Sequence, residues 1–346
     1  MDCTNPRTYG ADSLCKCPFS ILTFNVYPGP PVPRTASDLF PHRIAAQIEA
    51  LRKLDPDIVC LQELYCDKSF AALRDAFPDY DVRRDSGMHD EHPRRRRGNA
   101  SALGIIAGAL LGAAVMSCSS WRPALLHLAA AASLWFGAYL VLPSNSGLAA
   151  WLSNRGTGLG IMVRRTRATV IEHWVEHFVS QEGDLLNWVA PRGFARTMIA
   201  LNTACNCGPA PAFVFNTHLN ALGSDEHRAA QAKQLAREIR RVSTAARVVL
   251  CGDFNESPTL QSGVREWLEG DEHEQAGLMF AEPMCRPTYC PQQNPLARGS
   301  YAPQCLDHIY FKTGNDEGLV PTDAARLVFT DPPHLSDHYG VLAKLH

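Results

Sequence analysis

The sequence predicts a layered α/β fold, and two features of the chain lead to this prediction. The first is a strand, helix, strand order near the N-terminus, in which both strands are apolar, as expected where helices cover a sheet. The second is a series of short apolar runs that each stand beside polar residues, as expected of buried strands. At 346 residues, the chain is long enough to bury a large core.

The first elements are a strand, a helix and a second strand. Residues 20–26 show the alternating pattern of side chains that is typical of a strand and are rich in β-formers. They end before the proline-rich segment 28–31. Residues 58–61 form a second, fully apolar strand. Between them, four apolar residues recur at helical spacing up to a stop at 55–57: Ile44, Ile48, Leu51 and Leu54.

More apolar runs predict further elements in the second half of the chain. A helix is expected after residue 220, with Ala229, Ala232, Leu235 and Ile239 on one face. A long surface loop is expected at 283–303, which is rich in proline, asparagine and glutamine. The expected strands cover 156–163, the residues leading to 201, 212–216 and 247–251, and two more begin near 306 and 340.

Charge and cysteine content limit the classes of protein to consider. The net charge of −2 gives no argument for a nucleic-acid partner. The twelve cysteines are scattered and several lie within apolar runs, so reduced thiols in a cytosol-facing domain are expected. A disulfide is the alternative at one place, the group Cys285, Cys290 and Cys305. The N-terminus lacks the pattern of a cleaved signal peptide.

Residues 99–142 form an apolar insertion that interrupts the α/β pattern. Each half approaches the roughly 20 residues that a helix needs to cross a bilayer. Glycines at 104, 108 and 112 would let two such helices approach closely. We therefore predict a membrane-spanning helical hairpin. The alternatives are a helical hairpin buried in a soluble core and a disordered, alanine-rich insertion.

The insertion divides the chain into three parts. Residues 1–18 are a polar arm, residues 19–98 and 143–346 form one α/β domain, and 99–142 would anchor that domain to a bilayer. A hairpin returns both ends of the domain to the same side of the membrane. The four arginines at 94–97 predict that this side is cytosolic and that anionic lipid headgroups lie against them.

Six polar clusters stand beside the apolar runs, and together they indicate a metal-assisted hydrolase. Their oxygen donors, without cysteine or histidine at metal-ligand spacing, favour Mg²⁺ over Zn²⁺, with Mn²⁺ as a second candidate. The clusters are NV at 25–26, LQE at 61–63, THLN at 217–220, GDFN at 252–255, LDHI at 306–309 and SDH at 336–338.

In this order, the clusters resemble the endonuclease/exonuclease/phosphatase superfamily over the whole chain outside the insertion. The resemblance implies a four-layer α/β sandwich of two packed mixed β-sheets, like deoxyribonuclease I, with the site at one end. It implies that His338 is the general base and that Asp307 fixes its tautomer. The other implied roles are Asp253 for orienting water, Asn255 and His218 for donating to phosphoryl oxygens, and Glu63, Asn25 and Asp337 for holding the metal.

Within the superfamily, the chain looks similar to the neutral sphingomyelinase branch. Residues 191–194, Pro-Arg-Gly-Phe, resemble that branch's Lys-Gly segment, although arginine replaces lysine and the acidic partner Asp184 is more distant. The helix residues Arg228 and Gln231 and the loop around Asn294 match too. His308 departs from the tyrosine of many relatives. This resemblance implies that Asn220, Arg192 and Asn294 contact the substrate.

The expected function is therefore Mg²⁺-dependent hydrolysis of a membrane phospholipid, with sphingomyelin cleaved to ceramide and phosphocholine. The catalytic domain would sit on a membrane and face the cytosol. A membrane-tethered nuclease or inositol-phosphate phosphatase could use the same catalytic residues, although the near-neutral charge counts against nucleic acid. A non-catalytic membrane scaffold is the third reading, but it would require the loss of a key group, and all are present.

Overall fold

The structure is a computed structural model that describes residues 18–27, 36–85, 156–180, 191–202, 210–221, 223–243, 247–256, 262–272, 274–281, 286–297, 299, 302–312 and 321–345. Nearly all of the predicted arm and the whole of the insertion 99–142 lie outside these ranges, so both remain predictions. Within them, no helix is both long enough and apolar enough to cross a bilayer.

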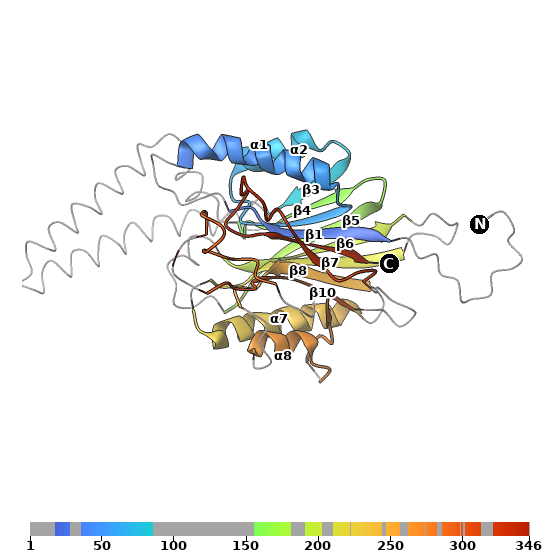
Figure 1. The fold of residues 1–346 in the computed structure, drawn as a ribbon. Helices are drawn as coiled ribbons and strands as arrows, with labels where there is room; N and C mark the ends of the chain where they lie inside the picture. The colour runs from blue at the N-terminus through green and yellow to red at the C-terminus, as the bar shows by residue number, and fades with distance from the viewer. Residues whose placement is uncertain are drawn as a thin grey trace, which may run out of the picture.

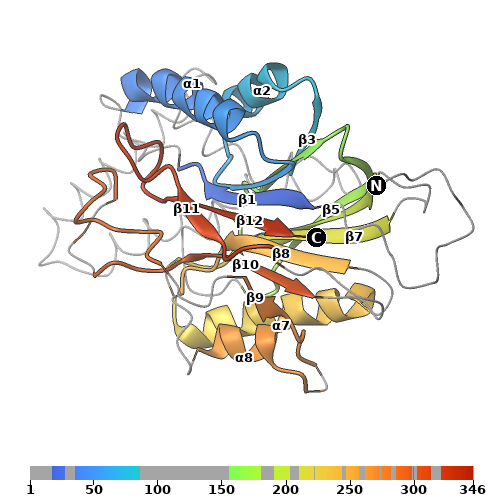
Figure 2. The same cartoon turned by 45° about the vertical axis from the view of Figure 1, so that its right-hand side comes forward.

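Two mixed six-stranded sheets pack face to face, and helices cover the outer face of each (Figure 1). The first sheet has the order β11-β12-β1-β2-β4-β3, and Figure 2 shows β11 and β12 beside β1. Its strands are β1 (Phe19–Asn25), β2 (Ile58–Gln62), β3 (Tyr80–Arg84), β4 (Gly160–Arg164), β11 (Arg326–Val328) and β12 (Gly340–Leu345).

The second sheet has the order β5-β6-β7-β8-β10-β9. Its strands are β5 (Ala168–His177), β6 (Gly193–Leu201), β7 (Ala210–His218), β8 (Arg247–Asp253), β9 (Met279–Phe280) and β10 (Asp307–Lys312). Helices α1 (Ala36–Leu54) and α2 (Asp67–Ala76) lie on the first sheet, and α7 (Asp225–Ser243) and α8 (Gly263–Glu269) on the second (Figure 1). The described residues therefore form the predicted four-layer α/β sandwich.

Three apolar clusters hold the layers together. The central one lies between the sheets, where Ile21 of β1 packs with residues such as Val249 of β8. The next residue along β1, Leu22, belongs to the cluster under α1 and α2, because successive strand residues point to opposite faces. The third cluster packs α7 and α8 on the second sheet, with Leu235 and Leu268 fully buried. Both faces of each sheet are thus covered, which is why the strands read as continuous apolar runs.

The strand registers bring the polar clusters to one end of the sandwich. The parallel pair β7 and β8 sets His218 beside Asp253. The antiparallel pair β8 and β10 sets Asp307 against the same Asp253. In the first sheet, the parallel pair β1 and β2 sets Asn25 beside Gln62, directly before Glu63.

Several elements were not predicted from the sequence, namely β3, β5, β9, β11, α2 and α8. Strand β5 forms one edge of the second sheet and exposes Ile171 and Trp174, so it lacks the apolar run of a covered strand. Strand β9 has two residues and β11 has three, too few for a periodic signal. These elements depend on pairing with longer neighbours.

The expected surface loop at 283–303 is more buried than its composition suggests. Its described residues contain no helix or strand, but Thr288 and Asn294 are almost completely buried. The loop therefore packs against the end of the sandwich.

The expectation of reduced thiols holds for most of the described cysteines and is wrong for one. Cys60, Cys66, Cys251 and Cys290 are free. Cys305 is disulfide-bonded, and it belongs to the group that the sequence marked as the alternative.

Candidate active site

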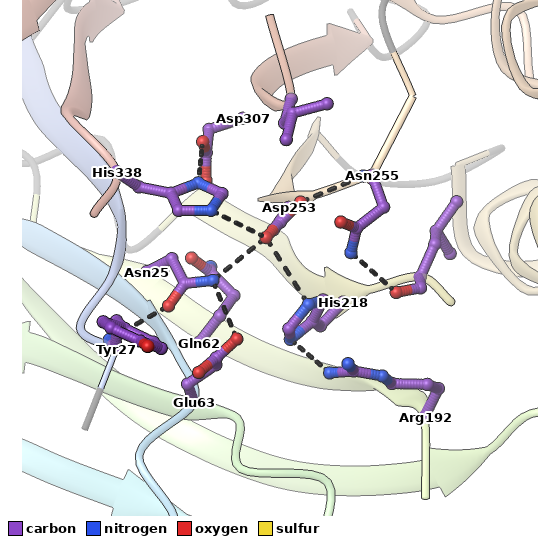
Figure 3. Close-up of polar contacts among 12 residues, drawn as sticks. Asn25, Tyr27, Gln62, Glu63, Arg192, His218, Asp253, Asn255, Asp307 and His338 are labelled. Atoms are coloured by element: carbon purple, nitrogen blue, oxygen red, sulfur yellow. Dashed lines mark hydrogen bonds and ion pairs between the residues drawn. The ribbon is translucent and has the colours of Figure 1, made fainter. Parts of the chain in front are cut away.

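Polar side chains from both sheets meet at one end of the sandwich, and most of them are buried (Figure 3). Asp253 stands in the middle of the group, with His338 and Asp307 on one side and His218 on the other. Asn25 and Glu63 approach from the first sheet. Asn25 and Asp253, which are 228 positions apart in the chain, are therefore in hydrogen-bond contact.

The His338 and Asp307 side chains form the expected imidazole–carboxylate pair. His338 Nδ1 and Asp307 Oδ2 are 2.7 Å apart. Burial alone would lower the pKa of His338, but the carboxylates of Asp307 and Asp253 outweigh it and raise this pKa well above the usual value. Because Asp307 accepts the Nδ1 proton, Nε2 is the nitrogen that can take a proton from another group.

The loop at 286–297 holds Asp307 in place. Thr288 Oγ1 accepts hydrogen bonds from the backbone N–H groups of Leu306, at 3.0 Å, and Asp307, at 3.1 Å. Thr288 O also accepts from Tyr339 N, at 2.8 Å, so one residue ties the start of β10 to the segment that carries His338.

Asp253 joins the two halves of the site. Its Oδ2 accepts from Asn25 Nδ2 at 3.0 Å and lies 3.4 Å from His218 Nε2 and 3.8 Å from His338 Nε2. Its Oδ1 accepts from the backbone N–H of Asn255 at 2.9 Å. Burial and the like charge of Asp307 raise the pKa of Asp253 to about 7. A buried carboxylate in this position favours a proton or a cation beside it.

Asp253, Asp307 and His338 form a group that could hold a divalent metal, since one ligand atom from each lies within 4.8 Å of the others. The group passes a further test of fit, because Asp307 Oδ1 is buried and has no hydrogen-bond partner among the described residues. Two neighbouring carboxylates with an unsatisfied oxygen match the donor preference of a hard cation.

The predicted ligands Glu63, Asn25 and Asp337 lie beside this group. The Tyr27 backbone N–H donates to Asn25 Oδ1 at 3.0 Å, which turns the amide NH₂ toward Glu63, at 3.3 Å, and Asp253. A direct bond from Asn25 oxygen to a metal would therefore require this amide to turn. Burial, with a contribution from Glu63, raises the pKa of Asp337 to about 7. The metal-ligand roles of the three residues stay predictions.

Two site residues have backbone conformations that L-amino acids rarely adopt. Glu63 has φ 60° and Asn255 has φ 50°, both in the left-handed region. Asparagine tolerates this region better than glutamate does. Glu63 directly follows β2, and Asn255 lies two residues after the end of β8. Such outliers often accompany functional positions.

The remaining predicted donors are His218 and Asn255. Asn255 Nδ2 donates to the backbone oxygen of Leu219 at 3.0 Å, which holds the segment after β7 against the one after β8. His218 Nδ1 lies 2.6 Å from Arg192 NH1. Burial and the Arg192 charge lower the pKa of His218 well below the usual value, so this imidazole is neutral.

The predicted substrate contacts differ in what their side chains do. Asn220 accepts from Gln231 Nε2 at 2.9 Å, and its own Nδ2 is buried without a partner among the described residues, so it can donate to a ligand. Asn294 donates to Ser336 O and accepts from Leu296 N, which gives it a structural role. Arg192 contacts His218 and Tyr65. Their binding roles stay predictions.

The sequence analysis assigned no role to the residues that support the site from behind, although two of its clusters contain Gln62 and Ser336. Gln62 Nε2 donates to Asn216 Oδ1 at 2.7 Å and so links the two sheets beneath the site. Ser336 Oγ donates to Asn25 O at 2.6 Å. Gln62 directly precedes Glu63, and Ser336 directly precedes Asp337. This position is the signal that could have indicated their roles. Tyr65 carried no such signal.

The Endonuclease/Exonuclease/phosphatase family model matches residues 22–338, which include every residue of the site described above. The chain belongs to this family. Membership makes the chain a phosphodiesterase-type hydrolase of the superfamily, with a buried Asp/His group that resembles a metal site. No curated protein sequence matches it.

Solved structures of the family share the fold at low sequence identity. D. rerio TDP2 in complex with a single-strand DNA product is 15% identical with a TM-score of 0.61, covering 95% of this chain and 99% of that one. The family protein from Bacteroides vulgatus is 15% identical with a TM-score of 0.60, covering 96% and 99%. The human Nocturnin catalytic domain with bound sulfate is 14% identical with a TM-score of 0.57, covering 95% and 94%. These similarities indicate no particular branch of the family.

Proposed function

We propose that this family member is a Mg²⁺-dependent phosphodiesterase that hydrolyses a membrane phospholipid, with sphingomyelin as the preferred substrate and ceramide and phosphocholine as products. The observation that carries the hydrolytic part is the buried His338–Asp307 pair, 2.7 Å apart, beside Asp253. The lipid part rests on the insertion 99–142 and on the branch resemblance of the sequence.

In the proposed reaction, His338 Nε2 takes a proton from a water molecule whose oxygen forms a bond to phosphorus. The bond between phosphorus and the ceramide oxygen breaks, that oxygen takes a proton from solvent water, and His338 releases its proton to solvent. Asp307 holds the imidazole and stabilises its positive charge while it carries the proton. His218, with its Nε2 facing Asp253, and Asn220, with its unpartnered Nδ2, are the donors for the phosphoryl oxygens.

The carboxylates of Asp253, Asp307 and Glu63 would hold the cation, which supplies positive charge to offset the charge on the phosphoryl and leaving oxygens. The pKa of Asp253, raised to about 7 by burial and by Asp307, is consistent with a site that gains from a nearby cation.

The position of the insertion supports a substrate in the bilayer. The chain leaves the described fold after Asp85 and re-enters it at 156, and Asp85 Oδ2 accepts from Thr157 N at 2.7 Å. The adjoining Gly158 lies against the ring of Tyr65, whose hydroxyl contacts Arg192 of the site. A membrane anchor rooted here would hold the site near the lipid surface, with the catalytic domain on the cytosolic side.

A nuclease is the second candidate function, because the D. rerio TDP2 structure with a similar fold contains a single-strand DNA product. The catalytic groups named above would serve either substrate. The substrate-binding surface and the insertion would then decide between them.

One assay tests the proposal. The purified chain with Mg²⁺ is incubated with sphingomyelin vesicles, glycerophospholipid vesicles, short single-stranded DNA and an inositol phosphate, with His338→Ala as the blank. Release of phosphocholine from sphingomyelin by the native chain alone is the expected result. Cleavage of DNA or the inositol phosphate in place of lipid would overturn the lipid assignment and keep the hydrolase.

A further inference from the structure

Arg192 reaches the site without facing the metal-binding group. It directly precedes β6, and its guanidinium NH1 lies 2.6 Å from His218 Nδ1 (Figure 3). The same NH1 lies 3.2 Å from the hydroxyl of Tyr65. On the other side of the imidazole, His218 Nε2 lies 3.4 Å from Asp253 Oδ2. His218 therefore stands between a permanent cation and the central carboxylate.

These contacts determine which nitrogen of His218 carries the proton. A guanidinium has only N–H donors and stays protonated, so it can meet Nδ1 only if Nδ1 is an acceptor. A proton on Nδ1 would set two donors against each other at 2.6 Å. The proton of the neutral ring must then lie on Nε2, the nitrogen that faces Asp253.

The backbone around Arg192 is built to hold this contact. Arg192 O accepts from Phe178 N at 3.0 Å. At the next position, a Cβ on Gly193 would lie 2.2 Å from Glu176 O and 2.9 Å from Thr157 Cγ2, so only glycine lets the strand start so close to its neighbour. Tyr65 is fixed in turn by Gly158, where a Cβ would lie 2.5 Å from its ring.

We infer that Arg192 is a positioning residue, which keeps Nδ1 of His218 free of a proton so that Nε2–H is the group presented to the substrate phosphoryl. This role differs from direct substrate contact. Only the expected effect on turnover rests on the proposed hydrolysis. The position of the proton on His218 can be observed without any substrate.

The test uses the full chain with ¹⁵N-labelled histidine, in the presence of Mg²⁺ and at one fixed pH. His218→Gln identifies the His218 signals by their loss. The variants are Arg192→Met, which removes every donor, and Arg192→Lys, which restores a donor of similar reach. Arg196→Met, on strand β6, which begins directly after Arg192, is the matched control for loss of an arginine. Circular dichroism checks that each variant is folded.

The expected result is a non-protonated Nδ1 signal and a protonated Nε2 signal for His218 in the native chain, Arg192→Lys and Arg196→Met. In Arg192→Met the non-protonated Nδ1 signal should be lost. Turnover should fall in Arg192→Met by roughly 10- to 100-fold, the scale for removing a group that orients a functional histidine, with KM little changed and with recovery in Arg192→Lys.

Two results would overturn the inference. One is a proton on Nδ1 of His218 in the native chain. The other is an unchanged Nδ1 signal in Arg192→Met together with a loss that appears in KM, which would make Arg192 a direct substrate contact. If the native chain hydrolyses none of the test substrates, the proposed function fails, and the NMR result still decides the position of the proton.

Discussion

At the scale of single residues, the site converges on Asp253. Its two oxygens contact Asn25 and Asn255 and face His218 and His338. The raised pKa of this carboxyl follows from burial and from the like charge of Asp307. A catalytic site can use such an arrangement, because a cation that enters it relieves the repulsion between the two carboxylates.

Loss of the base should remove most of the activity. His338→Ala deletes the group that accepts the proton of the attacking water, so kcat should fall by at least ~10²-fold, the usual scale for a general base. Asp307→Asn should cause a smaller loss, because the imidazole remains. Steady-state kinetics measure both, with thermal unfolding as the control for folding. Near-native turnover in His338→Ala would remove this residue from the mechanism.

The position of the metal can be tested by two isosteric changes. Glu63→Gln and Asp253→Asn each remove one negative charge and keep the shape of the side chain. If the replaced residue binds Mg²⁺, activity should require a much higher Mg²⁺ concentration. Titration of activity and calorimetric binding of Mg²⁺ measure the shift. Zn²⁺ should substitute poorly. Full activity of the native chain in excess chelator would contradict a metal-assisted reaction.

At the scale of elements, a loop and two strand ends hold the site together. Thr288 is fully buried and accepts two backbone hydrogen bonds at the start of β10, the strand that begins with Asp307.

The packing between the two sheets is the second element that holds the site. Cys60 of β2 and Cys251 of β8 belong to the central cluster between the sheets. The alignment of the two sheets therefore sets the distances among the catalytic groups.

Thr288→Val should destabilise the fold and reduce activity. The change keeps the shape of the side chain but leaves the N–H groups of Leu306 and Asp307 buried without a partner, at a cost of about 1–3 kcal/mol. Urea unfolding measures this free energy. Thr322→Val is the matched control, because Thr322 is exposed and should cost less than about 0.5 kcal/mol. Equal effects of the two changes would mean that the Thr288 contacts do not support the site.

The thiols between the sheets should resist alkylation. Burial and a hydrogen bond with Cys60 raise the pKa of Cys251 well above the usual value, so little reactive thiolate forms near the usual thiol pKa of about 8.5. Among the free cysteines in the part of the chain that the structure describes, Cys66 is half-buried and the others are buried, so Cys66 should react before Cys251. Maleimide labelling followed by peptide mass spectrometry compares the sites. Labelling of Cys251 as fast as Cys66 in the native chain would contradict the packed centre.

At the scale of the whole molecule, the two described chain ends that flank the apolar insertion lie side by side. Asp85 and Thr157, on either side of the undescribed stretch 86–155, are hydrogen-bonded to each other and buried. The two strands at this junction, β3 and β4, pair directly. The two ends of the described fold at this junction are therefore held together by direct contacts.

Removal of the insertion should leave a folded enzyme. Replacing residues 99–142 with a short Gly/Ser linker should keep hydrolysis of detergent-dispersed lipid and greatly reduce hydrolysis of intact vesicles, because the anchor is lost. Vesicle flotation and the two assays, run beside the full chain, measure this. An aggregated or unfolded product would show that the insertion packs into the sandwich and would end the membrane proposal.

The sequence by itself determined the α/β layering and named most of the residues that meet at the candidate site. Apolar runs such as 58–61 and 247–251 had to be covered on both faces, and this burial requirement is local enough to be read from hydropathy. The polar residues at the ends of these runs, including Glu63, Asp253 and His338, could be recognised because the ends of buried strands are where functional groups can emerge.

Only the tertiary structure decided which of these groups touch and how each is protonated. The opposition of Asp307 and Asp253 follows from the register of β8 with β10, and hairpin and crossover registers are not encoded within either strand. The amide orientation of Asn25 and the proton position on His218 depend on Tyr27 N and on Arg192, which approach through folding. Hydrogen-bond partners and burial set these states, and both arise from packing of segments that are distant in the chain.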